Sequence, residues 1–298
     1  MGRVLLSVPE YSHHTVRSLL ERGVAQFERA GISFGHGTTN ALDEAAWLIL
    51  HSLGLPLTEL DPHLDRPLDD AQYRAAKSLL DARVRTRKPA AYLTHEAWLG
   101  KHRFYVDERV IVPRSFIAEL IGKWEQTPSS VLDLCTGSGC LAILVALASP
   151  GAKVDAADLS SDALAVAKKN VADYKLGRRI RLVKSDLFSA LPARKYDLIM
   201  SNPPYVKASS MRKLPDEYRK EPAMALASGT DGLEHARRIL AQAREHLNAN
   251  GRLVVEIGHN RAALELAFPK LPFEWPKTSA GAGYVFTLSR EALAQERA

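Results

Sequence analysis

The sequence predicts an α/β protein, with a mostly parallel β-sheet covered by helices on both faces and a small helical domain before it. Two patterns lead to this prediction. From about residue 130 onward, short apolar runs alternate with amphipathic segments, which is typical of parallel strands joined by helical crossovers. Before residue 90, apolar residues recur at three- and four-residue steps, which indicates helices alone. The chain has 298 residues, enough for about two domains.

Three helices are expected in the first third of the chain. The central one follows Asn40, whose side chain suits the N-cap position. Its apolar stripe consists of Leu42, Ala45, Ala46, Ile49, Leu50 and Leu53. The flanking helices are expected at residues 13–30 and 69–88, and Pro89 stops the second of these.

The end of the third helix is basic. Its last two turns contain Arg83, Arg85, Arg87 and Lys88. Positive charge is favourable at a helix C-terminus, so a solvated helix end is preferred here to a phosphate-binding patch.

Residues 90–113 are rich in aromatic and β-branched side chains and are interrupted by Gly100-Lys101, which predicts a β-hairpin. We therefore expect a helical substrate-recognition domain at 1–89, a hairpin linker at 90–112 and a larger domain at 113–298. A short helix at 115–124 should open the larger domain. Strands are expected at 131–134, 154–158, 180–183, 197–200 and 253–257, with two weaker strands near residue 273 and at 284–288.

Composition narrows the class of protein. Hydrophobic residues make up 46% and charged residues 25%, as in soluble globular proteins. The net charge of +6 is mild for a dedicated nucleic-acid binder. Cys135 and Cys140 fall in one glycine-containing segment, and a metal site would need more ligands nearby, so we interpret them as small buried thiols in a reducing compartment. No membrane-spanning run or leader is recognised, so we expect a cytoplasmic protein.

A glycine-containing loop follows the first strong strand. The strand 131–134 runs into the segment Cys135-Thr136-Gly137-Ser138-Gly139, and a helix begins directly afterwards. Glycines here allow the backbone to approach a ligand closely. The spacing matches neither the dinucleotide fingerprint nor a phosphate-binding P-loop.

Acidic residues end the next two strands. Asp158 lies about 20 residues after the glycine loop, where a carboxylate can accept both hydroxyls of a ribose. Asp186 ends the third strand and can receive an adenine amino group, while Leu187 can cover the ring. Each aspartate alone is equally well explained as a helix N-cap. Together with the loop they favour an adenosine without a pyrophosphate, namely S-adenosylmethionine.

The tetrapeptide Asn202-Pro203-Pro204-Tyr205 follows the predicted strand 197–200 and the flanking Ser201. Asn202 and Pro203 offer carbonyl acceptors, neither proline has an N–H, and both prolines fix φ. Such a site suits a planar NH2 group, with Tyr205 as a stacking wall. An ordinary turn is the alternative, because Asn-Pro and Pro-Pro are turn dipeptides.

In this order, the glycine loop, the two aspartates and the tetrapeptide resemble class I S-adenosylmethionine-dependent methyltransferases that act on planar nitrogens. Further motifs resemble the protein-glutamine methyltransferases of the HemK group, and the segment Phe34–Ala45 resembles its PrmB branch. These further motifs are Tyr92-Leu93-Thr94, residues 110–115, residues 221–226 and residues 229–233. The resemblance implies a Rossmann-like, seven-stranded, mostly parallel sheet. It also implies methylation of a glutamine in the third large-subunit ribosomal protein.

The resemblance also implies roles for individual residues. Cofactor binding falls to Asp133, Cys135, Thr136, Gly137, Ser138, Gly139, Asp158, Asp186, Leu187 and Asn202. The residues expected to be catalytic are Asn202, Pro203 and Tyr205. The same three residues, together with Pro204 and Arg114, are expected to bind the substrate. Arg114 is equally well explained as the partner of a carboxylate. Cys135 departs from the wider superfamily, which often has glycine at this position. No metal is implied.

Other functions remain open at this stage. A release-factor glutamine methyltransferase would have nearly the same catalytic domain. A DNA adenine-amino methyltransferase would use the same tetrapeptide but needs base flipping and a target-recognition region. A non-catalytic ribosome-assembly module would be expected to have a degraded cofactor loop. The expected partner is the ribosomal protein, within an assembly intermediate near ribosomal RNA, and no membrane.

Overall fold

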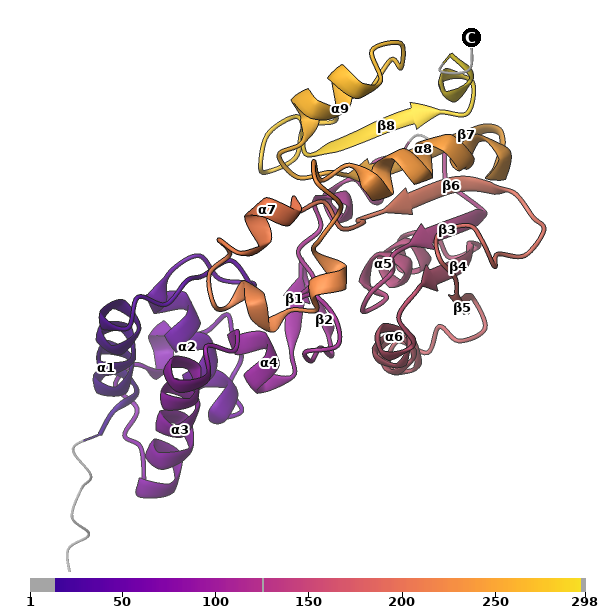
Figure 1. Ribbon diagram of the computed structural model, residues 1–298. Helices are drawn as coiled ribbons and strands as arrows, with labels where there is room; N and C mark the ends of the chain where they lie inside the picture. The colour runs from indigo at the N-terminus through magenta and orange to yellow at the C-terminus, as the bar shows by residue number, and fades with distance from the viewer. Residues whose placement is uncertain (1–13, 125, 296–298) are drawn as a thin grey trace, which may run out of the picture. The chain divides into compact units, whose positions relative to one another are not determined.

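The computed structural model describes residues 14–124 and 126–295, and the chain separates into two compact units between Thr94 and His95 (Figure 1). Each unit is described by itself. Among the described residues, no helix is both long and apolar enough to cross a membrane.

The first unit is helical, as expected. Its helices are α1 (Val16–Arg29), α2 (Ala41–Ser52), the short 3-10 helix η1 (Asp61–His63), α3 (Asp70–Thr86) and α4 (Ala90–Thr94). Asn40 caps α2 as predicted, because its side chain accepts a hydrogen bond from the Asp43 N–H at 2.9 Å. Residue 13, the predicted start of α1, lies outside the described residues.

Two predictions for this unit are wrong. Residues 90–94 form helix α4 rather than strand, because Pro89 can occupy a position preceding a helix and its carbonyl receives the Tyr92 N–H at 3.0 Å. Arg83 is fully buried rather than solvated. It forms an ion pair with the buried Glu44 of α2 and donates to the Ser33 carbonyl at 3.0 Å. Pairing of this kind makes a buried guanidinium tolerable.

The second unit begins with a β-hairpin and continues as an open sheet. The hairpin strands are β1 (Ala97–Leu99) and β2 (His102–Phe104). The sheet strands are β3 (Ser130–Leu134), β4 (Lys153–Asp158), β5 (Ile180–Lys184), β6 (Tyr196–Ser201), β7 (Leu247–Glu256) and β8 (Val285–Ser289). Their order is β5-β4-β3-β6-β7-β8, and β8 alone among them is antiparallel to its neighbour.

Helices connect the strands. They are α5 (Cys140–Ala148), α6 (Ser161–Asp173), α7 (Ala208–Met211), α8 (Glu234–His246) and α9 (Arg261–Ala267). Alternate residues of each strand pack into two separate apolar clusters. Val131 and Leu198 lie in the cluster that contains α5, whereas Leu132 and Ile199 lie in the cluster that contains α8. The sheet is therefore buried on both faces, as parallel sheets require.

Two predicted elements of the second unit are shorter than expected. The strand near residue 273 is reduced to a bridge between Glu274 and Thr287, so the described sheet has six strands rather than seven. Pro272 and Pro276 flank Glu274 and have no N–H to extend the pairing. The helix expected at 115–124 is a 3-10 turn, η2 (Phe116–Glu119).

Candidate active site

Apart from Arg114, the predicted site residues lie at or just after the carboxyl ends of four parallel strands. Because β3, β4, β5 and β6 run in the same direction, the loops after them emerge along one edge of the sheet. The strand order reverses at β3. The next strand in the chain, β4, lies on one side of β3, and β6 lies on the other side. Open α/β sheets bind ligands at such a switch point. The fold therefore gathers the glycine loop, Asp158, Asp186 and the tetrapeptide at one edge.

The glycine loop leaves space for a ligand. Gly137 and Gly139 have φ values of +55° and +80°. A Cβ at Gly139 would lie 3.2 Å from the Ala167 Cβ, so this glycine is needed for close packing of α5 against α6. A Cβ at Gly137 would meet nothing within 4 Å. The loop is thus packed on one side and open at Gly137.

Asp158 supports this loop directly. Its carboxylate accepts the Gly137 N–H at 2.8 Å and the Ser160 N–H at 2.9 Å. The helix that follows is capped by Ser160, whose side chain accepts from the Ala163 N–H. Asp158 is therefore not the N-cap that was its alternative explanation. Burial raises the pKa of its carboxyl above the ordinary value.

Asp133 lies beneath the loop and is 1% exposed. One of its oxygens accepts from the Thr136 hydroxyl at 2.5 Å and from the Ala142 N–H at 3.2 Å. Its other oxygen, Oδ1, has no hydrogen-bond partner among the residues that the structure describes. Burial, with a smaller contribution from the nearby Asp158 charge, raises the pKa of Asp133 to about 7. An unsatisfied acceptor at this depth suits a ligand donor.

Asp186 and Leu187 lie where the sequence predicts, after β5. Leu187 is 4% exposed and has a φ of +51°. Asp186 is partly exposed, and its carboxylate accepts a hydrogen bond from Arg238 of α8 at 2.8 Å. Any ligand amino group at Asp186 must share this carboxylate with Arg238.

The tetrapeptide is held by its backbone, and Asn202 is left open. Asn260 donates to the Tyr205 carbonyl at 2.8 Å, and a Cβ at Gly258 would lie 2.7 Å from the Tyr205 ring. Pro203 and Pro204 are buried, whereas Asn202 and Tyr205 are half-buried. Within residues 14–124 and 126–295, the Asn202 side chain has no hydrogen-bond partner. Its carbonyl is therefore available to a donor from outside the protein.

Arg114 is engaged by a carboxylate. Its guanidinium forms a bidentate pair with Glu221 at 2.5 and 2.7 Å and lies over the Tyr218 ring at 5.6 Å. Burial opposes the charge, yet the attraction of Glu221 raises the pKa of Arg114 above its ordinary value. Glu221 also accepts the Val112 N–H at 3.0 Å.

A second buried carboxylate holds the same stretch of chain. Glu256, at the end of β7, accepts from the Ser115 hydroxyl at 2.7 Å and the Phe116 N–H at 2.8 Å. Burial raises the pKa of Glu256. Together, Glu221 and Glu256 hold residues 112–116 beside the tetrapeptide, and their charges raise the pKa of Tyr205 further after the dominant effect of burial.

The sequence reasoning missed Glu221, Glu256, Gly258 and Asn260 as parts of the site. Glu221 was noticed only as part of a family motif. The signal for Glu256 was a lone carboxylate at the end of an apolar strand, inside the predicted strand 253–257. Such a residue is rarely buried without a specific partner.

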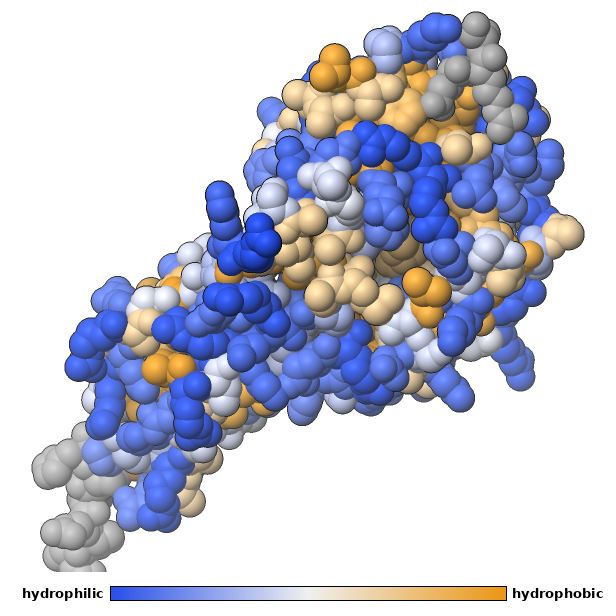
Figure 2. Space-filling view, in the orientation of Figure 1, coloured by the Kyte–Doolittle hydropathy of each residue, from blue (hydrophilic) through white to orange (hydrophobic). Residues whose placement is uncertain are grey.

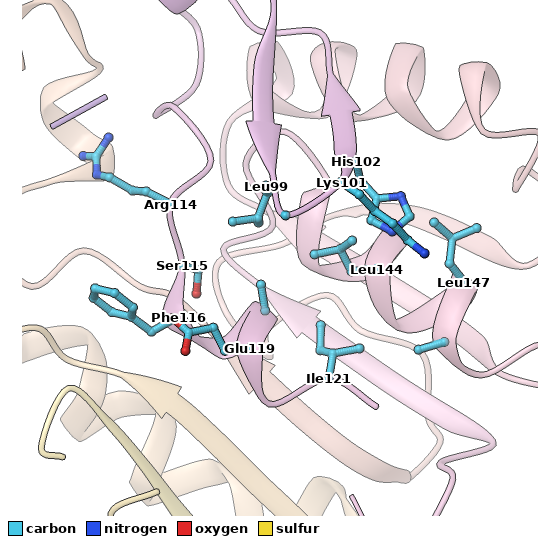
Figure 3. A pocket seen from close by; sticks show the side chains of 13 residues that line it. Leu99, Lys101, His102, Arg114, Ser115, Phe116, Glu119, Ile121, Leu144 and Leu147 are labelled. Atoms are coloured by element: carbon cyan, nitrogen blue, oxygen red, sulfur yellow. The ribbon is translucent and has the colours of Figure 1, made fainter. Parts of the chain in front are cut away.

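A separate cavity of about 630 Å³ lies between the hairpin, η2 and α5, lined by residues such as Leu99, Ile121 and Leu147 (Figure 3). The Arg114 side chain is directed away from Leu144 and Leu147 in this view (Figure 3). None of the strand-end residues Asp158, Asp186 and Asn202 lines the cavity, but Arg114 and Ser115 do, so the cavity adjoins the stretch 112–116 and does not contain the strand-end residues.

Both cysteines are unsuited to nucleophilic chemistry. Cys135 is half-buried in the loop and Cys140 is buried at the start of α5, and neither forms a disulfide. Burial raises the pKa of the Cys140 thiol to about 12 and raises that of Cys135 as well. Both thiols therefore stay protonated at neutral pH.

Two protein-family models match this chain, one in each unit. The model of the family described as "Methyltransferase small domain" matches residues 116–230, and that of the "PrmC N-terminal domain" matches residues 18–94. Three relatives carry the name "Ribosomal protein uL3 glutamine methyltransferase". The protein of Neisseria meningitidis serogroup B is 54% identical over 289 residues, covering 95% of each chain. Those of Burkholderia pseudomallei and Bordetella pertussis are 53% and 52% identical, covering 94% of this chain and 95% and 96% of theirs. This chain therefore belongs to the family of ribosomal protein uL3 glutamine methyltransferases.

Proposed function

We propose that this protein transfers a methyl group from S-adenosylmethionine to the side-chain amide nitrogen of a glutamine in ribosomal protein uL3. The single observation that carries this proposal is the unpaired Asn202 carbonyl, fixed beside two prolines and next to the open glycine loop. The uL3 substrate is the one that the names of the relatives give.

The glycine loop and its neighbours fit the cofactor. The open side of Gly137 leaves space for the part of the cofactor that contacts the loop backbone. Asp158 can accept hydrogen bonds from the ribose hydroxyls with the lone pairs that its two N–H donors leave free. Asp133 Oδ1 is an acceptor in need of a donor. When bound, S-adenosylmethionine would supply an electrophilic methyl group on a sulfonium, with the neutral thioether S-adenosylhomocysteine as the leaving product.

Asn202 and Pro203 act on the substrate amide. A carboxamide nitrogen is a poor nucleophile because its lone pair is delocalised into the carbonyl. Two fixed carbonyl acceptors can bond both amide hydrogens, orient the nitrogen and raise its electron density as the new bond forms. Tyr205 borders the flat amide group. The proton leaves after methyl transfer, because the methylated cation is strongly acidic, so no strong base is required.

The helical N-terminal unit and its loop 34–40 are proposed to select the protein substrate. A free ribosomal protein is basic and repels a protein of net charge +6, whereas ribosomal RNA attracts it. We therefore propose that uL3 is methylated in an assembly intermediate near ribosomal RNA, in the cytoplasm.

The test offers the purified enzyme labelled cofactor with three substrates, namely uL3, a release factor and adenine-containing DNA. Labelled uL3, with the methyl group located on a glutamine by mass spectrometry, is the expected result. Faster labelling of the release factor would assign this chain to the sister activity, and label in DNA would refute a protein substrate.

A further inference from the structure

The segment that follows the catalytic tetrapeptide is closed at its base. The Val206 N–H donates to the Leu226 carbonyl at 2.8 Å, and the Ser228 N–H donates to the Val206 carbonyl at 2.9 Å. Between these bonds the chain forms α7, a turn and two 3-10 helices, which are η3 (Tyr218–Lys220) and η4 (Ala223–Ala225). The segment 207–220 is therefore a projection whose base is fixed next to Tyr205.

Most exposed charges of this projection are positive. Its exposed cations are Lys207, Arg212, Lys213, Arg219 and Lys220. Asp216 is the exposed acid and pairs with Arg219 at 2.5 Å, whereas Glu217 and Glu221 are buried at 1% and 4% exposure. The space-filling view shows strongly hydrophilic side chains around α7 (Figure 2). Four cations thus lack an acidic neighbour within the projection.

Several arginines elsewhere on the surface of the second unit are paired, for example Arg237 with Asp231 and Arg261 with Glu265, although single cations such as Arg178 form no ion pair among the described residues. For Lys207, Arg212, Lys213 and Lys220, no ion pair exists among the described residues. Clustered like charges without partners repel one another and attract a polyanion.

We propose that the four cations of the projection 207–220 bind the phosphate backbone of RNA beside the amide site. This inference rests on the proposed function, in which the substrate is a ribosomal protein near ribosomal RNA. The one aromatic residue of the projection, Tyr218, already lies against Arg114, so contacts to phosphates rather than stacked bases are expected. Binding is accordingly independent of RNA sequence and sensitive to salt.

The test compares two variants that lose the same charge. The projection variant carries Lys207→Gln, Arg212→Gln, Lys213→Gln and Lys220→Gln. The control variant carries Lys168→Gln, Arg178→Gln, Lys270→Gln and Lys277→Gln, which replace exposed cations on α6, before β5 and after α9. Fluorescence anisotropy measures the affinity of each protein for a labelled RNA hairpin as a function of salt concentration.

Four phosphate contacts account for a slope of about three to four in the logarithm of affinity against the logarithm of salt. The projection variant should therefore have a slope about three to four units smaller than that of the native protein, and the control variant a nearly unchanged one. Equal slopes for the two variants would overturn the proposal. Tighter binding of poly-glutamate than of RNA would also overturn it, and would favour an acidic protein partner.

Methyl transfer separates this inference from the proposed function. The native protein should methylate uL3 bound to large-subunit RNA faster than free uL3. The projection variant should methylate free uL3 at least as fast as the native protein does, and RNA-bound uL3 no faster than free uL3. If native protein does not methylate uL3 in either form, the proposed function fails, whatever the RNA affinity. If the native protein and the projection variant methylate RNA-bound uL3 equally fast, the proposed RNA binding by the projection is refuted, whereas the proposed function is not.

Discussion

Replacing Gly258 by alanine tests whether the Tyr205 ring borders the reacting amide. The added Cβ would lie 2.7 Å from Tyr205 Cε2, and an ordinary contact begins at 3.4 Å, so the ring must move by about 0.7 Å. The backbone around the ring is tethered by Asn260 at the Tyr205 carbonyl and by the Val206–Leu226 hydrogen bond. The displacement therefore falls on the ring.

The expected loss is at least about tenfold in the single-turnover methylation rate, because a misplacement of about 1 Å costs roughly a hundredfold. Gly100→Ala is the matched control. Gly100 and Gly258 have φ values of +59° and +56°, so alanine adds a similar backbone strain of roughly 1–2 kcal/mol at either position. A Cβ at Gly100 meets nothing within 4 Å.

Thermal unfolding should show similar destabilisation in the two variants, while the rate falls in Gly258→Ala alone. In a Tyr205→Ala background, Gly258→Ala should have little further effect on the rate, because the contact is gone. Equal methylation rates for Gly258→Ala and Gly100→Ala would refute the placement of the ring beside the amide.

Four further changes test other parts of the site. Asp158→Ala should weaken S-adenosylmethionine binding by about 1.5–3 kcal/mol in calorimetry, the scale of charge-assisted hydrogen bonds, and unchanged affinity would remove the ribose assignment. Asn202→Ala should keep cofactor affinity and lower single-turnover rates by about a hundredfold; a loss below about tenfold would contradict the acceptor mechanism. Glu221→Gln should lower the free energy of unfolding by about 3 kcal/mol in urea titrations by leaving the half-buried Arg114 charge without its partner. Because burial raises the folded-state pKa of Asp133 to about 7, its stabilising contribution is full below the unfolded-state pKa of about 4 and is lost as pH rises through 7. Asp133→Asn should therefore gain stability relative to the native protein between about pH 4 and about pH 7, and a constant difference would contradict this.

Much of the catalytic edge could be predicted from the sequence because its signals are local. Asp158 ends the predicted strand 154–158 and Asn202 comes just after the predicted strand 197–200, and parallel strands bring their carboxyl ends to one edge whatever the exact packing. The expected glycine loop is present, with both glycines at positive φ. Asn40 as N-cap of α2 was predictable for the same reason, since a cap depends on neighbouring residues.

The errors concern partners that are distant along the chain. Glu44 lies 39 residues before Arg83, so nothing near the end of α3 indicated that this arginine would be buried. Glu256 meets Ser115 across 141 residues and Glu221 meets Arg114 across 107. A buried ion pair has no period in the sequence, and side-chain type alone favours the surface for each member.

In the proposed mechanism, the division of hydrogen bonds around the tetrapeptide explains how Asn202 would be selective without a nucleophile or a strong base. The nearby polar groups are satisfied within the protein. Ser201 donates to the Leu134 carbonyl at 2.9 Å, and Asn260 donates to the Tyr205 carbonyl. The Glu221 carboxylate accepts hydrogen bonds from Arg114. These bonds fix the backbone that carries Asn202, so the attachment point of its side chain is positioned before a substrate arrives. A planar NH2 group satisfies this acceptor, whereas a hydroxyl or thiol provides only one hydrogen for the two carbonyls. Preference for an amide over other nucleophiles thus follows from which acceptors the fold leaves unpaired.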